Sequence, residues 1–238
     1  MLHLLFLLAL IALLPLDLSL DLTLYHLAVL PLAFFTGIQV PVLMHNCMHG
    51  NLRWRWANLI AGELSSFFAL TGLEVLRLNH ALHHAHSDTA NDPHNPAQKS
   101  FFAFFLSGQF SGAVILEKKF YRFHGKRPRT MLLFKCNIVL HYAGHLVRLW
   151  AWALVLGPEY FVSFYLPAFA TYSLAFAHVN YVTHRRTQSG EVEIVNMEGN
   201  AYYRFINKIG SGIYFHKNHH RFPWLLNPMH AEGAGGPR

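Results

Sequence analysis

Residues 22–44 read LTLYHLAVLPLAFFTGIQVPVLM, a stretch with no formal charge, and residues 45–49 continue it as HNCMH. A helix that crosses a bilayer needs about 20 largely apolar residues, and this stretch is long enough. Two histidines, His45 and His49, follow directly at its end. The stretch therefore predicts a membrane protein with imidazole groups at the end of a span.

Three further segments are candidate spans. Residues 160–182 are uncharged, residues 131–156 are apolar but contain two cations, and residues 2–16 are short. Tight turns at 17–21 and 157–159 would join the four segments into two antiparallel pairs. We expect an all-α integral membrane protein with four transmembrane helices, at about residues 2–16, 22–44, 131–156 and 160–182.

Two other apolar segments fit interfacial or re-entrant helices better than spans. Residues 57–76 are interrupted by two glutamates, and residues 101–116 are too short to cross a bilayer. Because no Gly/Ser-rich linker divides the chain, we expect residues 1–238 to form one domain, with a loose tail at 231–238.

The charged residues are few, and most cations lie on one side of these spans. The chain is 53% hydrophobic and 13% charged, with a net charge of +7, whereas a soluble domain is about 25% charged. Apart from Lys135 and Arg148, every lysine and arginine lies in residues 51–130 or 183–238. Since cationic loops remain in the cytoplasm, we expect the histidine motifs and both termini there. The composition excludes a nucleic-acid-binding arm as the main theme, and two cysteines cannot make a disulfide framework.

Three motifs place histidines three or four residues apart, which is the spacing of one helix face. Each motif can therefore direct its imidazoles at one site. The motifs are HNCMH with His45 and His49, HALHH with His80, His83 and His84, and HKNHH with His216, His219 and His220.

A fourth element, NYVTH, lies at the end of the 160–182 segment. Asn180 and His184 are four residues apart and share a helix face, whereas His178 points largely away from His184. We therefore take Asn180 and His184 as site residues and keep His178 in reserve.

Nine histidines and one asparagine exceed what a single tetrahedral zinc ion binds. Two transition-metal ions with five or six ligands each would use them all. Imidazole binds iron, copper, zinc and nickel, so the ligand type alone does not choose the metal. Iron is favoured because a site beside lipid chains suggests oxygen chemistry on those chains. The candidate metal-binding residues are His45, His49, His80, His83, His84, Asn180, His184, His216, His219 and His220.

Acidic and aromatic side chains near these motifs could support the site. Carboxylates orient ligating histidines by accepting their second N–H group, and aromatic rings could line an acyl tunnel or simply face lipid. The acidic candidates are Glu74, Asp88, Asp92 and Glu198, and the aromatic candidates are Trp54, Trp56, Phe67, Phe68 and the 101–105 run.

Two polar features have more than one interpretation. His141, His145 and Arg148 share a face of the 131–156 segment, where polar groups are costly; they could bind haem, support the metal site or contact a polar lipid head. The stretch KKFYRFHGKRPR at 118–129 could face anionic lipids. It could also dock an acidic electron donor, an acyl carrier protein or a coenzyme A phosphate.

Taken together, these motifs resemble those of the membrane fatty acid desaturase superfamily. HALHHAHSDTANDPHNP at 80–96 is similar to its second histidine box, and GIYFHKNHHRFP at 212–223 resembles its third. Residues 180–184 match the NxxxH element of the acyl-CoA desaturases. The likeness extends over residues 22–228. As departures, Asn46 stands where many relatives have aspartate, and the chain has no fused cytochrome b5 or HPGG haem motif.

The resemblance implies a non-haem di-iron centre held by the nine histidines, which Asn180 reaches through water. It implies four spanning helices with a cytoplasmic helical cap that carries the histidine boxes. The implied activity is the O2-dependent introduction of a double bond into a fatty acyl chain of a lipid or acyl thioester. Electrons would come from a separate donor of ferredoxin or cytochrome b5 type with its reductase.

Two other functions remain open at this point. A hydroxylase or ketolase would act on a lipid or carotenoid by the same di-iron chemistry, and the small size of the chain favours it. A non-enzymatic metal- or haem-binding membrane protein is the third possibility, favoured by His141 and His145.

Overall fold

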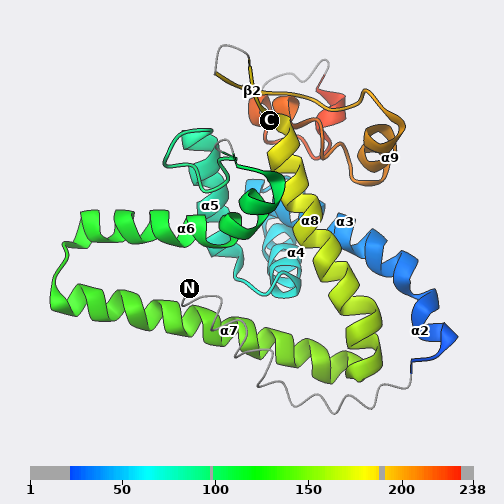
Figure 1. The fold of residues 1–238 in the computed structure, drawn as a ribbon, viewed down its shortest axis with the longest axis horizontal. Helices are drawn as coiled ribbons and strands as arrows, with labels where there is room; N and C mark the ends of the chain where they lie inside the picture. The colour runs from blue at the N-terminus through cyan, green and yellow to red at the C-terminus, as the bar shows by residue number, and fades with distance from the viewer. Residues whose placement is uncertain (1–21, 97–98, 188–190, 232–238) are drawn as a thin grey trace.

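The computed structural model describes residues 22–96, 99–187 and 191–231. The expected span at 2–16, the turn at 17–21 and nearly all of the tail at 231–238 lie outside these residues. The described chain is mostly helical (Figure 1). Its elements are α2 (Leu24–Ala28), α3 (Leu30–His49), α4 (Arg55–Phe68), α5 (Leu73–His86), α6 (Phe101–His124), α7 (Pro128–Tyr160), η1 (Phe161–Tyr165), α8 (Leu166–Thr183), β1 (His184–Arg186), β2 (Val192–Ile194), α9 (Ala201–Ile209), α10 (His216–Arg221) and η2 (Pro228–His230).

Two helices in the described chain are long and apolar enough to cross a membrane, Leu24–His49 and Pro128–Thr183. A third span results only if α4 and α5, which are bent by 94° at their junction, count as one. The first helix contains most of the predicted 22–44 span. The second contains the predicted 131–156 and 160–182 spans. Within residues 22–96, 99–187 and 191–231, the structure therefore supports two or three crossings by length and composition.

The long helix Pro128–Thr183 changes direction at Gly157, inside the predicted turn at 157–159. Gly157 has φ 71° and ψ 164°, a backbone conformation essentially restricted to glycine. Figure 1 shows α7 and α8 running in different directions from this point. One glycine thus divides a continuous apolar run into two helices.

The two segments predicted as interfacial or re-entrant are both helical. The 57–76 segment becomes α4 and the start of α5, and the 94° bend between them is the geometry of a broken span or a re-entrant loop. The 101–116 segment is the first part of the longer helix α6. This helix continues to His124 because the residues after the apolar run also favour a helix. Helix α7 then runs back along α6 (Figure 1).

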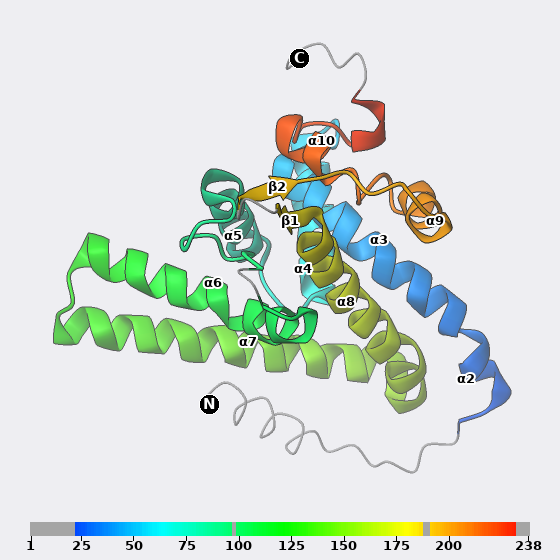
Figure 2. The ribbon, with the colours of Figure 1, turned by 45° about the horizontal axis from the view of Figure 1, so that its top comes forward.

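The core lies where α3 packs against α8, α4 and η1. Tyr165, Phe161 and Met44 are fully buried there, and the Tyr165 hydroxyl donates a hydrogen bond to the Phe68 carbonyl at 2.9 Å. Gly37 lets α3 and α8 approach closely. A Cβ atom added to it would lie 2.5 Å from the Ala168 carbonyl oxygen. This packing brings the last turns of α3 and α8 together, beside α5 and α10 (Figure 2).

We predict that Gly37→Ala destabilises the protein, because the added methyl group forces α3 away from Ala168 and Thr171. Overpacking of this kind costs about 1–3 kcal/mol, which should lower the midpoint of thermal unfolding in detergent. Gly108→Ala in α6 is the matched control, since nothing lies within 4 Å of its added Cβ. The control should leave the midpoint unchanged or raise it, because alanine favours a helix. Equal midpoints for the two variants would contradict the close packing of α3 on α8.

Candidate metal centre

Four separate parts of the chain carry the predicted histidine motifs to one place. His45 and His49 occupy the last two turns of α3, and the HALHH histidines lie in α5. His184 is the first residue of β1, directly after α8, and the HKNHH histidines lie in α10. The ends of these elements converge in Figure 2. All nine predicted histidines take part.

The first cluster contains five histidines whose candidate ligand nitrogens all lie within 4.8 Å of one another. The Nε2 atoms of His49 and His80 are 2.7 Å apart, those of His80 and His84 3.0 Å, and those of His84 and His219 2.9 Å. These imidazoles come from α3, α5 and α10. The members of the first cluster are His45, His49, His80, His84 and His219.

The second cluster contains four histidines within the same distance limit, namely His83, His184, His216 and His220. The Nε2 atom of His216 lies 3.1 Å from those of His184 and His220. The two clusters adjoin, since the rings of His84 and His220 stack with their centroids 4.3 Å apart. The described residues thus offer two neighbouring sites, each with a set of nitrogen donors.

Two of the predicted carboxylates, Asp92 and Asp88, each contact the Nδ1 atom of an imidazole in the second cluster. Asp92 Oδ1 lies 2.8 Å from His83 Nδ1, and Asp88 lies 3.0 Å from His184 Nδ1. A carboxylate that accepts the Nδ1–H fixes the tautomer in which Nε2 keeps its lone pair. Asp88 adopts a left-handed conformation with φ 64°, which aspartate tolerates better than most residues.

The other two predicted carboxylates do not reach the site. Glu74 pairs with Arg77 on the surface of α5. Glu198 is exposed in the segment before α9. A position close to a histidine motif in sequence was therefore insufficient to identify a supporting acid.

The histidines of α10 are in the neutral form that binds a metal. Burial, reinforced by neighbouring imidazoles, holds the pKa of His216 and of His219 well below the usual range. The same causes lower the pKa of His220 to about 2. At neutral pH these rings consequently carry no charge and keep a lone pair.

The donor set fits a metal ion. His83 shows this most directly: its Nδ1 faces Asp92, while its buried Nε2 has no hydrogen-bond partner among the described residues. A buried nitrogen without a partner is costly unless something else binds its lone pair. Neutral imidazole nitrogens are ligands for iron, copper, zinc and nickel.

Asn180 is buried near the site, whereas His178 is used elsewhere. The Asn180 side chain lines a cavity of about 50 Å³ that is also lined by His45, His80, His216 and His219. Its Nδ2 donates a hydrogen bond to the Phe176 carbonyl at 2.8 Å, so its Oδ1 is the atom left to accept a hydrogen bond. His178 belongs to neither cluster, and its Nδ1 lies 2.6 Å from the Tyr214 hydroxyl.

The walls of this cavity differ from the predicted aromatic tunnel. None of the aromatic residues proposed from the sequence lines it, and Trp54 and Trp56 are 53% and 60% exposed. The apolar part of the wall comes instead from α3, α8 and the segment around α10. Its apolar residues are Pro41, Val42, Phe176, Val179, Ile213, Leu225, Leu226 and Pro228.

Sequence reasoning missed several asparagines that bind the ligand-bearing segments together. Asn51 Nδ2 donates to Asn46 Oδ1 and to the Pro223 carbonyl, which joins the end of α3 to the segment after α10. Asn218 exchanges hydrogen bonds with Asn196, through its own backbone N–H and its side chain. The sequence did contain a signal for this role, because Asn46 and Asn218 lie inside two of the histidine motifs.

The polar group on α7 stays outside both clusters. The Nδ1 of His145 lies 2.8 Å from the His141 carbonyl oxygen, one helical turn away. Arg148 lies with its guanidinium carbon 6.0 Å from the centre of the Phe67 ring. These contacts are local, and they leave the three interpretations of His141, His145 and Arg148 open.

Comparison with known proteins identifies the family. The family model described as "Fatty acid desaturase" matches residues 22–232, nearly all of the chain. No curated protein and no solved structure matches the chain. The match includes all nine clustered histidines and the two carboxylates behind them. With these histidines gathered into two sites that could hold metal ions, the chain belongs to the fatty acid desaturase family.

Proposed function

We propose that this protein is an O2-dependent di-iron oxidoreductase that introduces a double bond into a fatty acyl chain of a lipid or acyl thioester. One observation carries the proposal: two adjoining histidine clusters border an apolar cavity in a chain of the desaturase family. The clusters supply the redox site, and the cavity supplies a place for hydrocarbon.

We assign one iron ion to each cluster, with five histidines for the first and four for the second. Within each cluster the candidate ligand atoms lie within 4.8 Å of one another, and several Nε2 pairs lie only 2.7–3.1 Å apart, so the nitrogens of one cluster could share one ion. Asn180 completes the ligand set through a water molecule.

Iron bound in these clusters would supply the chemistry that removes two hydrogens from adjacent saturated carbons as O2 is reduced to water. The protein's part is to position the groups. Asp88 and Asp92 hold the imidazoles of His184 and His83 in one orientation. The apolar wall excludes water and holds a methylene group near the nitrogens of His45 and His216. Small errors in such positioning change the rate strongly.

The reaction also requires two electrons and a membrane setting. We propose that a separate protein of ferredoxin or cytochrome b5 type, with its reductase, delivers the electrons. The apolar helices Leu24–His49 and Pro128–Thr183 favour integration in a membrane. We propose that the histidine clusters face the cytoplasm, because the lysines and arginines gather in the same parts of the sequence.

Expression in a host that lacks such an activity should yield lipids whose acyl chains have lost two hydrogen atoms. Mass analysis of the extracted lipids checks this outcome, and His83→Ala is the inactive control. Gain of one oxygen atom would instead identify a hydroxylase or ketolase. An unchanged lipid and carotenoid profile with an active electron donor present would contradict both enzymatic functions.

The purified protein should contain two iron ions per chain, one for each cluster. His49→Ala and His220→Ala remove a ligand from different clusters, and each should lose about half of the iron. His124→Ala is the control, because His124 is exposed on α6 and belongs to neither cluster. Elemental analysis measures the metals. One zinc ion per chain in the wild type would contradict the di-iron assignment.

Asp88→Asn and Asp92→Asn should each weaken iron retention by about 10- to 100-fold, because loss of an oriented second partner frees the imidazole. Dialysis against graded chelator concentrations, followed by iron measurement, tests this without relying on activity. Glu74→Gln and Glu198→Gln are matched controls, since neither carboxylate contacts a clustered histidine in the described structure. Equal iron retention in all four variants would exclude the role proposed for Asp88 and Asp92.

A further inference from the structure

A second cavity, of about 180 Å³, lies between α6 and the end of α5. Helix α6 contributes one face to it, because residues 115, 118, 119 and 122 follow the three- and four-residue spacing of a helix. The end of α5 and the loop after it contribute the opposite wall. The lining residues are His86, Asn91, Ile115, Lys118, Lys119 and Arg122.

The charge in this cavity is positive and uncompensated. Lys118, Lys119 and Arg122 make no ion pair with any described residue, and no carboxylate lines the cavity. The carboxylates of the adjacent loop, Asp88 and Asp92, are turned toward His184 and His83. Like charges held close together on a helix are destabilising until an anion neutralises them.

We propose that this cavity is a binding site for a phosphate group. Two ammonium groups, one guanidinium, an amide and an imidazole are the donors that recognise phosphate oxygens. The volume is several times the roughly 30 Å³ that a water molecule occupies, so a phosphate group fits. A protein partner would bury about 800 Å² on this surface, which six residues around a recess do not provide.

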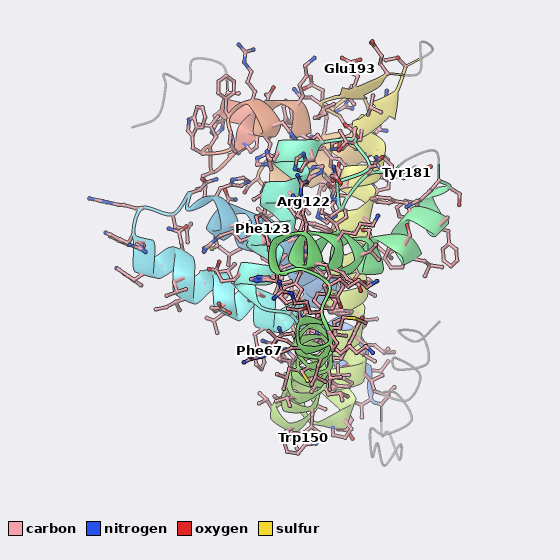
Figure 3. All side chains as sticks on the ribbon, turned by 90° about the vertical axis from the view of Figure 1, so that its left-hand side faces the viewer. Phe67, Arg122, Phe123, Trp150, Tyr181 and Glu193 are labelled. Atoms are coloured by element: carbon pink, nitrogen blue, oxygen red, sulfur yellow. The ribbon has the colours of Figure 1, made fainter. Side chains whose placement is uncertain are left out.

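The cavity adjoins the candidate metal centre through one short segment. His86 lies in the same helix as His83, and the loop from Asp88 to Asp92 contains Asn91, which lines the cavity. Figure 3 has Arg122 on the side of α6 that faces this loop. A phosphate bound here therefore contacts the segment whose carboxylates orient two clustered imidazoles. Binding itself does not depend on the reaction proposed above.

The test uses the full chain in detergent, with inorganic pyrophosphate as the free anion and dihexanoylphosphatidate as the lipid-borne one. Dihexanoylglycerol, which lacks the phosphate, is the ligand control. Isothermal titration should show binding of at least one phosphate compound and none of dihexanoylglycerol. The tighter of the two phosphate compounds identifies whether the natural phosphate is free or lipid-borne.

The site variant is Lys118→Gln/Lys119→Gln/Arg122→Gln, and it should weaken phosphate binding about tenfold or more because three charged donors are lost. Lys126→Gln/Arg129→Gln/Lys135→Gln removes the same charge from positions outside the cavity and should weaken binding less than about threefold. His86→Gln offers a milder single change. Circular dichroism and thermal unfolding confirm that the variants are folded.

Equal weakening by the site and control variants would overturn the proposal, since binding would then follow net charge alone. Absence of binding by both phosphate compounds would also overturn it. So would a salt-sensitive loss of electron-donor affinity in the site variant without any change in phosphate binding, which would indicate a docking surface. Iron content and lipid products, measured on the same samples, report the proposed function separately.

Discussion

Nine imidazoles gathered within one small volume form the constraint that the rest of the fold satisfies. Their nitrogens approach to about 3 Å, where lone pairs repel unless a proton or a cation lies between them. Holding them there requires rigid supports behind each ring. The structure provides these supports as carboxylates behind His83 and His184 and as half-buried asparagines between the ligand-bearing segments. The polar residues around the site therefore have a positioning role, which is to keep the imidazole nitrogens close together.

These supports hold the imidazoles in place because the helices behind them, α3 and α8, are closely packed. Gly37 brings α3 and α8 into direct contact, and this contact determines the distance between the ends that carry His49 and His184. The core aromatics lie farther along the same interface, around Tyr165. Geometry at the metal centre thus depends on packing inside the apolar part of the molecule. A close-packed interior transmits small shifts instead of absorbing them.

Sequence spacing predicted which histidines converge, but it could not predict how they divide between two clusters. His83 and His84 are neighbours in α5 and join different clusters, because successive helical residues point about 100° apart. That division depends on where α10 lies, and no local pattern encodes it. Hydropathy identified the two long apolar helices but ended α6 too early, since the helix continues through charged residues to His124. For Trp54 and Trp56, which the sequence could place either in a tunnel wall or facing lipid, their exposure favours the second interpretation.

The division of α10 between the two clusters has a consequence for how the protein is made. His219 belongs to the first cluster, and His216 and His220 belong to the second. Neither set of ligands is therefore complete until the ribosome has synthesised residues 216–220. The hydrogen bonds from Asn51 to the Pro223 and Leu225 carbonyls form later still, when that segment folds back onto the end of α3. The ligand set of this centre is consequently completed only after both apolar helices, Leu24–His49 and Pro128–Thr183, have been synthesised.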